Sequence, residues 1–250
     1  MMTERITSRQ NPLLIHLKKL LNSRSYRETC GQFAGDGVKL LREAVLWDAA
    51  LETVVMTEGA VTFPLPEHVR KVVIPGDVMR SVSQMEAPQG AIFICRTPVQ
   101  NSLSLPKRCL ILDGIQDPGN VGTILRTADA LEIPVLLSDG CADPWGPKTV
   151  RASMGAVFRN PPVTAERQQI LNCCREQGIP VFVTALSRRA VDLRQSDLRG
   201  AVVIGSEGSG VCAEFLDSAE QELIIPMNPR CESLNAAAAA TIVMWEMKNK

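Results

Sequence analysis

The stretch CLILDGIQDPGNVGTILRTADAL, residues 109–131, decides the fold class. It begins with a near-continuous apolar run over 109–114 and passes through a loop rich in Gly, Asn and Asp. It then carries apolar side chains at helical spacing over 120–131. A near-continuous apolar run is typical of a parallel strand that is covered on both faces. Strand, loop and helix in this order predict one βα unit of an α/β protein.

The same alternation continues to the C-terminus. Four more apolar runs follow: IPVLLS (133–138), PVFVTAL (180–186), AVVIGS (201–206) and ELIIPM (222–227). Helical patterns lie among them, over residues 147–158, 165–177, 212–219 and 234–248. This arrangement predicts an open parallel sheet with helices on its faces. Ligands of such sheets bind beyond the carboxyl ends of the strands, so functional residues are expected directly after the apolar runs.

The N-terminal part reads as a separate, smaller α/β unit. Apolar residues have helical spacing over 12–29 and 37–50, and the short β-rich runs are TVVM (53–56), KVVI (71–74) and AIFI (91–94). The polar, Pro-bounded segment RTPVQNSLSLP then resembles a linker. We therefore predict an N-terminal domain over 1–96, a linker over 97–107 and a C-terminal domain over 108–250.

Composition narrows the class of protein. With 250 residues, 45% hydrophobic, 22% charged and a formal net charge of +0, the chain is an ordinary globular protein. The first thirty residues are biased towards positive charge and include Arg5, Arg9, Lys18 and Lys19. Such a bias is typical either of a solvated helix face or of a surface that contacts nucleic acid.

The cysteines and the N-terminus bear on the compartment. Eight cysteines are scattered without a C-x-x-C pair or a nearby histidine, so zinc sites and disulfides are not expected, nor any other metal. The first ten residues, MMTERITSRQ, lack the apolar segment of a signal peptide, and no apolar run is long enough to cross a bilayer. A reducing cytoplasm is the expected location, with no membrane partner.

Three loops follow predicted strands and carry Gly, Asn and Ser. They are QDPGNVGT (116–123), SEGSG (206–210) and MNPRCESLN (227–235). Any single one of them can be explained as turn chemistry. The glycines match neither a dinucleotide-binding G-x-G-x-x-G nor a P-loop, and no nucleophile–base pair is evident. An α/β nucleotide-binding enzyme of another type would need such a feature.

Taken together and in this order, the loops resemble the three motifs of the SpoU (TrmH-type, SPOUT superfamily) RNA ribose 2'-O-methyltransferases. The first motif is LDGIQDPGNVGTILRTADAL, the second AVVIGSEGSGV and the third LIIPMNPRCESLNAAAAATIVMWE. KTVRASMGAVFR, around Arg151, also recurs in that family. The N-terminal ITSRQNPLLIHLKKL and GQFAGDGVKLLREAV are similar to an RNA substrate-binding domain built like kink-turn-binding ribosomal proteins. There Asp36 stands where Glu is commoner.

The resemblance implies a fold and a cofactor that the pattern alone does not. It implies a deep trefoil knot in the C-terminal domain, S-adenosyl-L-methionine bound in the knot, and a homodimer whose active site is completed across the interface. Knots are otherwise almost absent from proteins. By motif, the cofactor contacts fall on Gly205, Ile225, Leu234 and Thr184, mainly through their backbone groups.

The catalytic residues that the resemblance implies are Asn120, Arg126, Glu207, Ser233 and Asn235. The family assigns activation of the 2'-hydroxyl to Arg126. A guanidinium has a reference pKa far above neutral pH and rarely gives up its proton. We therefore expect a charged Arg126 to bind the adjacent phosphate and stabilise the developing alkoxide. Asn120 is expected to orient Arg126 or the ribose. Asn235 has an alternative interpretation as a helix cap, and Glu207 has one as a structural anchor of its loop.

The alanine run Ala236–Ala240 predicts a narrow helix, because five alanines cover more than one turn with methyl groups only. Residues 241–245 are expected to continue this helix into the dimer contact.

The expected substrate is RNA, with ribosomal RNA favoured over tRNA by the extra N-terminal domain. Its phosphates are expected to meet Arg5, Arg9, Lys18, Lys19 and Arg151. Two alternatives remain: a tRNA 2'-O-methyltransferase, and a catalytically silent knotted RNA-binding assembly factor. The presence of all five motif side chains disfavours the second. The sequence does not identify the target nucleotide.

Overall fold

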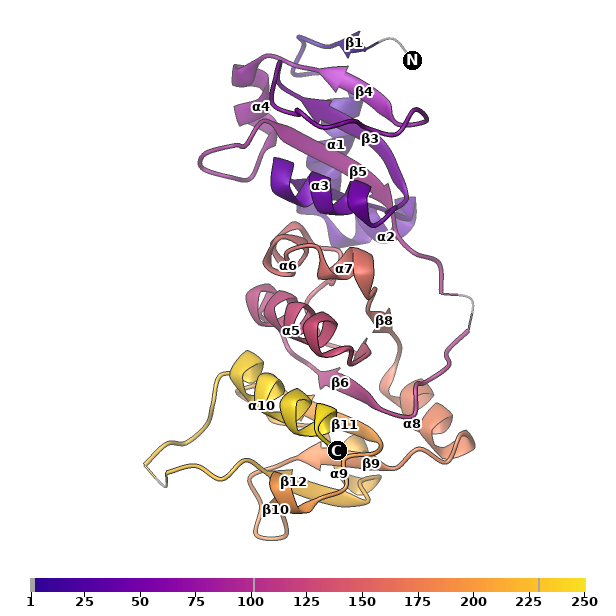
Figure 1. Cartoon of the computed structure of the whole chain (residues 1–250), viewed down its shortest axis with the longest axis vertical. Coiled ribbons are helices and arrows are strands. Elements are labelled where there is room, and N and C mark those ends of the chain that lie inside the picture. Colours follow the sequence, from indigo (N-terminus) through magenta and orange to yellow (C-terminus); the bar gives the residue numbers. More distant parts are fainter. Residues whose placement is uncertain (1–2, 101, 229) are drawn as a thin grey trace. The chain divides into compact units, whose positions relative to one another are not determined.

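The computed structural model describes residues 3–100, 102–228 and 230–250. The chain divides into two compact units (Figure 1). The first holds the chain up to Val99 together with Asp143–Arg159, and the second holds Gln100–Ala142 together with Asn160–Lys250. The chain therefore passes from one unit to the other three times.

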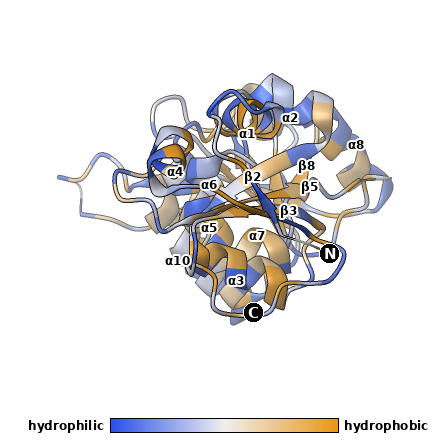
Figure 2. Ribbon diagram, turned by 90° about the horizontal axis from the view of Figure 1, so that it is seen from above, coloured by the Kyte–Doolittle hydropathy of each residue, from blue (hydrophilic) through white to orange (hydrophobic). Residues whose placement is uncertain are grey.

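A mixed sheet forms the centre of the first unit. Among the described residues its strands are β1 (Glu4–Arg5), β2 (Gln32–Asp36), β3 (Leu51–Met56), β4 (Arg70–Val73) and β5 (Ala91–Arg96), in the order β1-β4-β3-β5-β2. Strands β1, β4 and β3 are parallel, whereas β5 is antiparallel to both β3 and β2. The three β-rich runs of the N-terminal sequence correspond to β3, β4 and β5, and hydrophobic residues dominate β3 and β5 (Figure 2).

Strand β2 was not expected from the sequence, because glycine has little preference for strands. Gly35 pairs with Phe93 of β5, and a Cβ atom on Gly35 would lie 2.2 Å from the Phe93 ring. The ring therefore occupies the space that a side chain at this position would need. This contact between distant residues, rather than local preference, makes Gly35 the residue that fits.

The helices of the first unit are shorter than the sequence predicts. They are α1 (Pro12–Asn22), α2 (Arg24–Cys30), α3 (Val38–Leu46), α4 (Gly76–Val82), α6 (Pro147–Ala152) and α7 (Ala156–Arg159). The single helix expected over 12–29 is interrupted at Ser23, which is extended, with φ −127° and ψ 116°. Its hydroxyl accepts a hydrogen bond from the Tyr26 amide at 3.2 Å and caps α2.

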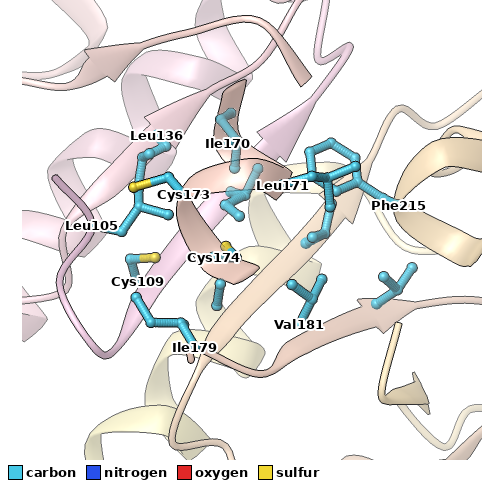
Figure 3. Packing of buried hydrophobic residues seen from close by; sticks show 14 of the residues in the cluster. Leu105, Cys109, Leu136, Ile170, Leu171, Cys173, Cys174, Ile179, Val181 and Phe215 are labelled. Carbon is cyan, nitrogen blue, oxygen red and sulfur yellow. The ribbon is translucent and has the colours of Figure 1, made fainter. Parts of the chain in front are cut away.

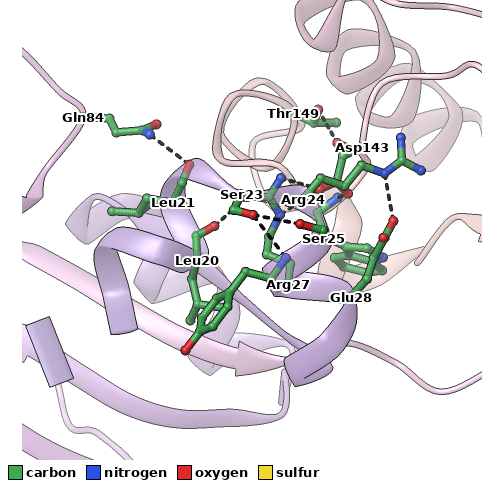
Figure 4. A network of polar contacts seen from close by, with 12 residues as sticks. Leu20, Leu21, Ser23, Arg24, Ser25, Arg27, Glu28, Gln84, Asp143 and Thr149 are labelled. Carbon is green, nitrogen blue, oxygen red and sulfur yellow. Dashed lines mark hydrogen bonds and ion pairs between the residues drawn. The ribbon is translucent and has the colours of Figure 1, made fainter. Parts of the chain in front are cut away.

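Residues 143–159 pack within the first unit. Phe33 of β2 lies 4.8 Å from Trp145 and 6.2 Å from Phe158, measured between ring centroids. Figure 4 shows the polar contacts: Arg27 of α2 forms a buried ion pair with Asp143, with 2.5 Å between Nη2 and Oδ2, and also donates to the Leu20 carbonyl. Aromatic packing and a buried charge pair thus join this segment to the N-terminal strands and helices.

The second unit contains the expected parallel sheet. Within its described residues the strands are β6 (Cys109–Asp113), β7 (Val135–Leu137), β8 (Val163–Thr164), β9 (Val181–Thr184), β10 (Val191–Asp192), β11 (Ala201–Gly205) and β12 (Gln221–Ile224). Their order is β10-β12-β9-β11-β6-β7-β8, and every neighbouring pair is parallel. The five apolar runs correspond to β6, β7, β9, β11 and β12, which confirms an α/β fold with a parallel sheet. The two-residue strands β8 and β10 form the two edges of this sheet.

The helices of the second unit cover this sheet. They are α5 (Pro118–Leu131), α8 (Arg167–Glu176), α9 (Ala213–Asp217) and α10 (Ala236–Lys248), with a 3-10 turn η1 (Leu193–Gln195). One hydrophobic core joins α8 and α9 to the strands, and it includes Cys109, Cys173, Cys174 and Phe215 (Figure 3). Burial raises the pKa of the Cys109 thiol to about 12 and that of Cys174 to about 11. These cysteines therefore act as small apolar side chains.

The described residues contain neither a membrane-spanning helix nor a cluster of metal ligands. No helix there is both long and apolar enough to span a bilayer. No group of three or more His, Cys, Asp or Glu side chains there is placed to hold a metal ion. All eight cysteines are free thiols.

Candidate active site

The loops after β9, β11 and β12 surround one cavity at the carboxyl ends of the strands, where parallel sheets bind ligands. Its volume is about 660 Å³, within the range of small-molecule sites. Four predicted cofactor contacts line it: Thr184 from β9, Gly205 from β11, Ile225 after β12, and Leu234 before α10. The structure thus brings together residues that are up to 50 positions apart in the chain.

Gly205 is a position where only glycine fits. A Cβ atom there would lie 2.1 Å from the carbonyl carbon of Gly210, so the backbone of the second loop would have to shift. The close approach follows from a tight turn in which Ser206 and Gly210 exchange two backbone hydrogen bonds, of 3.1 and 2.9 Å. Gly205 therefore keeps the second loop folded against the end of β11.

Three of the predicted catalytic side chains form one hydrogen-bonded cluster. The Glu207 Oε1 atom accepts hydrogen bonds from the side-chain amides of Asn120 and Asn235, at 2.9 and 3.0 Å. The Asn235 amide also donates to Asn120 Oδ1 at 3.0 Å. Each residue belongs to a different motif loop, so this cluster ties the three loops to one another.

The cluster also caps α10. Glu207 Oε1 accepts the Ala236 backbone N–H at 3.0 Å, and Asn235 Oδ1 accepts those of Ala237 and Ala238 at 3.0 and 3.3 Å. Helices leave their first N–H groups without partners inside the helix, and a negative charge beside them is stabilising. Asn235 is thus the N-cap of α10, and hydrogen bonds connect Glu207 to the first and third loops. Glu207 also lines the cavity, and Asn235 lies between the lining residues Leu234 and Ala236.

Ser233 and Arg126 lie outside this cluster. Ser233 is exposed and lines the cavity beside Leu234. Arg126 is exposed on α5 and lines a separate depression with Ile242 and Trp245 of α10. Among the described residues it makes no hydrogen bond or ion pair, and the Asn120 amide is engaged by Glu207 and Asn235 instead. The expected contact between Asn120 and Arg126 is therefore absent from the described part of the chain, because the two residues lie on different faces of α5.

Sequence reasoning missed Asp113 at the end of β6. This carboxylate is 2% exposed and accepts hydrogen bonds from the Ser138 hydroxyl at 2.7 Å, Arg167 Nε at 2.8 Å and the Cys212 backbone N–H at 2.8 Å. Burial alone would raise the pKa of Asp113, but these hydrogen bonds outweigh it and hold the pKa below its ordinary value. The sequence feature that could have identified Asp113 is an acidic residue at the end of an otherwise apolar run. Asp113 connects the end of β6 to the starts of α8 and α9.

The predicted RNA contacts lie in the first unit and differ in their surroundings. Arg5 is paired with Glu58 at 2.6 Å and Arg9 with Asp77 at 2.7 Å, in exposed ion pairs. Lys19 lies over the ring of Tyr26, with Nζ 5.3 Å from the centroid. Lys18 is half-buried, and Arg151 is exposed on α6.

Comparison with known proteins adds to this geometry. The family model described as "SpoU rRNA Methylase family" matches residues 107–245. The family model described as "MRM3-like substrate binding domain" matches residues 11–92. The Bacillus subtilis protein named 23S rRNA (guanosine(2553)-2'-O)-methyltransferase RlmP is 31% identical over 249 residues, which is 98% of this chain and 99% of that protein.

Two solved structures are similar over nearly the whole chain. The AdoMet-bound rRNA methyltransferase of Sinorhizobium meliloti has a TM-score of 0.86 at 26% identity, covering 99% of this chain and 98% of that one. A TrmH-family protein of Porphyromonas gingivalis has a TM-score of 0.85 at 32% identity, covering 96% and 98%. Because the family match spans more than half of the chain and the Bacillus relative spans nearly all of it, the chain belongs to the SpoU rRNA methylase family.

Proposed function

We propose that the protein transfers a methyl group from S-adenosyl-L-methionine to a ribose 2'-hydroxyl of ribosomal RNA. One observation carries this proposal: the Asn120–Glu207–Asn235 cluster joins three motif loops beside a cavity of about 660 Å³. The names of similar proteins support it. The Bacillus relative is named for 2'-O-methylation of 23S rRNA, and the Sinorhizobium structure is described as bound to AdoMet.

The residues around the cavity suit such a cofactor. Ile225 and Leu234 give it apolar walls, whereas the glycine-rich second loop brings backbone groups to its edge. The Thr184 hydroxyl donates to the Val203 carbonyl at 3.0 Å, so recognition at Thr184 falls to its backbone. We assign the cofactor contacts to Gly205, Ile225, Leu234 and Thr184.

The proposed methyl transfer mainly requires that the methyl group and the ribose hydroxyl be aligned. When bound, S-adenosyl-L-methionine supplies a methyl group that its sulfonium already activates, so the proposed transfer uses no metal ion. The chain has to place the ribose hydroxyl in line with that methyl group and ease the loss of its proton. Glu207 and Asn235 hold the third loop, and with it Ser233, at the cavity. In this proposal Ser233 and Asn120 then orient the substrate.

We propose that Arg126 acts within a homodimer. It lies on the α5–α10 face beside Trp245, which is 59% exposed, and Ile242, which is 38% exposed. A large exposed aromatic side chain next to an aliphatic one favours burial against a second copy. In such a dimer Arg126 of one subunit completes the site of the other. There its fixed charge binds the phosphate and stabilises the developing alkoxide.

The knot, the domain boundaries and the location are also part of this proposal. The last strand, β12, lies between β9 and β10, and the segment after it borders the same cavity as the second loop. These features support a C-terminal segment threaded into a deep trefoil knot, as in the family. We propose a substrate-binding domain over 1–96, a linker over 97–107 and a catalytic domain over 108–250, whose segment 143–159 packs within the first unit. Eight free thiols support a reducing cytoplasm.

The test is a map of ribose methylation across total RNA from cells with and without the gene. We expect one 2'-O-methyl group in rRNA to disappear and to return with the wild-type protein but not with Arg126→Ala. Loss of a tRNA site instead would establish the tRNA alternative. Loss of no site, together with a ribosome assembly defect that Arg126→Ala rescues, would establish the silent assembly factor.

A further inference from the structure

The turn between α6 and α7 holds a strained residue. Met154 has a φ of 51°, a left-handed conformation that is uncommon for side chains other than glycine. Its neighbours fix this conformation. Ser153 is fully buried and donates to the Val150 carbonyl at 2.7 Å, and a Cβ atom on Gly155 would lie 2.8 Å from Glu43. Met154 is thereby held outward, 48% exposed. Strain that its surroundings impose in this way clusters at functional sites.

Arg151 lies one turn before this residue, on α6. It is exposed, and in the described part of the chain it has no hydrogen bond or ion pair, which is also true of Lys148 on the same helix. Arg5 and Arg9, by contrast, are already paired with Glu58 and Asp77. A phosphate that binds Arg5 or Arg9 must displace a carboxylate, whereas Arg151 is available to it directly.

Asp36, at the end of β2, supplies the second independent observation. It is 6% exposed, and its Oδ2 atom accepts from the Ser83 hydroxyl at 2.6 Å and the Gln84 backbone N–H at 3.2 Å. Its Oδ1 atom is the one buried side-chain oxygen or nitrogen within residues 3–100, 102–228 and 230–250 that has no partner. Helix α6, which carries Arg151, packs against β2, which ends at Asp36. Burial raises the pKa of Asp36, whereas the hydrogen bonds from Ser83 and Gln84 and, to a smaller extent, the charge of Arg151 lower it. A buried acceptor without a partner requires an explanation.

We propose that Arg151 and Met154 form an RNA contact of the first unit, and that Asp36 is the positioning residue for Arg151. A guanidinium has five N–H donors in a fixed fork, so it can bind the free oxygen of Asp36 and an RNA phosphate at the same time. Met154 provides a polarizable apolar surface for the nucleoside next to that phosphate. This inference rests on the proposed function, because it names how the same substrate is held.

RNA binding tests the contact. The probe is a 23S rRNA transcript, and its Kd is measured at several salt concentrations for the wild type, Arg151→Gln and Met154→Ala. Arg175→Gln is the matched control, since Arg175 is an exposed arginine on α8 of the other unit. We expect Arg151→Gln to weaken binding roughly tenfold and to reduce the slope of log Kd against log salt by about 1. Met154→Ala should weaken binding by a smaller factor.

A double-mutant cycle tests the positioning role. Asp36→Asn keeps the shape of the side chain and removes its charge. We expect it to raise the Kd and KM for RNA without changing kcat, and to have no further effect when Arg151→Gln is already present. Asp36→Glu should restore binding in part. Arg151→Lys is exposed and spares the fold, and it should lose most of the coupling to Asp36 because it lacks the fork.

The outcomes separate the two proposals. Arg151→Gln and Met154→Ala variants that bind RNA as Arg175→Gln does would overturn the contact. An equal loss from Asp36→Asn with and without Arg151 would overturn the positioning role, because Asp36 would then act only through the fold. In either case a wild-type protein that methylates rRNA leaves the proposed function standing. A wild type that binds no RNA would refute both.

Discussion

Removal of the Glu207 carboxylate should loosen the start of α10 and stop methyl transfer. One oxygen of this side chain accepts three hydrogen bonds: from Asn120 and Asn235 at 2.9 and 3.0 Å, and from the Ala236 N–H at 3.0 Å. A buried hydrogen bond to a charged group contributes about 1.5–3 kcal/mol, but Glu207 is exposed and solvent reduces that value. We therefore expect Glu207→Ala to destabilise the protein by about 1–2 kcal/mol, which is typical of a lost helix cap.

The measurements follow from this geometry. At about 2–4 °C per kcal/mol, Glu207→Ala should lower the Tm by about 2–8 °C. Hydrogen exchange should rise at the Ala236 amide, whose acceptor is lost, and at Ala237 and Ala238, because the Asn235 cap is released. Methyl transfer should fall by more than tenfold, because Ser233 and Asn235 lose their placement. Glu207→Gln keeps an acceptor oxygen without the charge and should fall between the two.

Glu220→Ala is the matched control. Glu220 is an exposed acid of the same unit, and within the described residues its side chain accepts no hydrogen bond. It should match the wild type in all three measurements. A Glu207→Ala protein that kept both wild-type hydrogen exchange at residues 236–238 and full turnover would contradict this reasoning. That result would show that the hydrogen bonds among the three loops neither hold the start of α10 nor support methyl transfer.

Three further predictions concern the cavity, acid stability and the dimer. Gly205→Ala places a methyl group 2.1 Å from the Gly210 backbone, so affinity for S-adenosyl-L-methionine in calorimetry should be lost. The pKa of Asp113 is lower in the folded than in the unfolded state, where it is about 3.9. The carboxylate therefore stabilises the fold fully above that unfolded value, and this stabilisation disappears as the pH falls through the lower folded value. Asp113→Asn should lower stability at pH 7 and reduce the dependence of Tm on pH in that acid range. Ile242→Asp, on the exposed α5–α10 face, should halve the mass in sedimentation and reduce turnover at least tenfold.

Each of these has an outcome that contradicts it. Wild-type cofactor affinity in Gly205→Ala would mean that the second loop can shift without consequence. An unchanged pH dependence of Tm in Asp113→Asn would show that other carboxylates control acid unfolding. A monomeric Ile242→Asp protein with full turnover would show that each subunit carries a complete site. Thr241→Ser, next to it on α10, is the conservative control.

The parallel sheet could be predicted because each of its five main strands lies within a mainly apolar run, and that property is local to the sequence. The breaks in the helices could not. Ser23 interrupts an otherwise continuous apolar pattern, since its hydroxyl caps α2 rather than facing solvent. The turn at Met154 depends on Gly155 packing against Glu43, more than a hundred residues away in the chain. Strand β2 likewise depends on the partner ring of Phe93.

The site divides in the same way. Strand ends followed by small polar loops predicted where the ligand lies, and family motifs predicted which residues lie there. The contacts among Asn120, Glu207 and Asn235 join positions 87 and 115 residues apart, which spacing alone cannot reveal. Asp113 was overlooked because a lone acid at a strand end has no motif of its own. The placement of Arg126 on another face of α5 from Asn120 is not marked by any motif and is seen only in the structure.

The packing of residues 143–159 has a consequence for how such a protein can be shortened or acquired. A domain attached by a single linker can be gained or lost by one cut in the gene. Here removal of residues 1–99 would leave Trp145 and Phe158 without the aromatic ring of Phe33, and Asp143 without Arg27. Asp143 would then keep a charge without its partner, and Trp145 and Phe158 would expose aromatic surface to solvent. A shortened protein would therefore need new residues at Asp143, Trp145 and Phe158 as well as the loss of its N-terminal region.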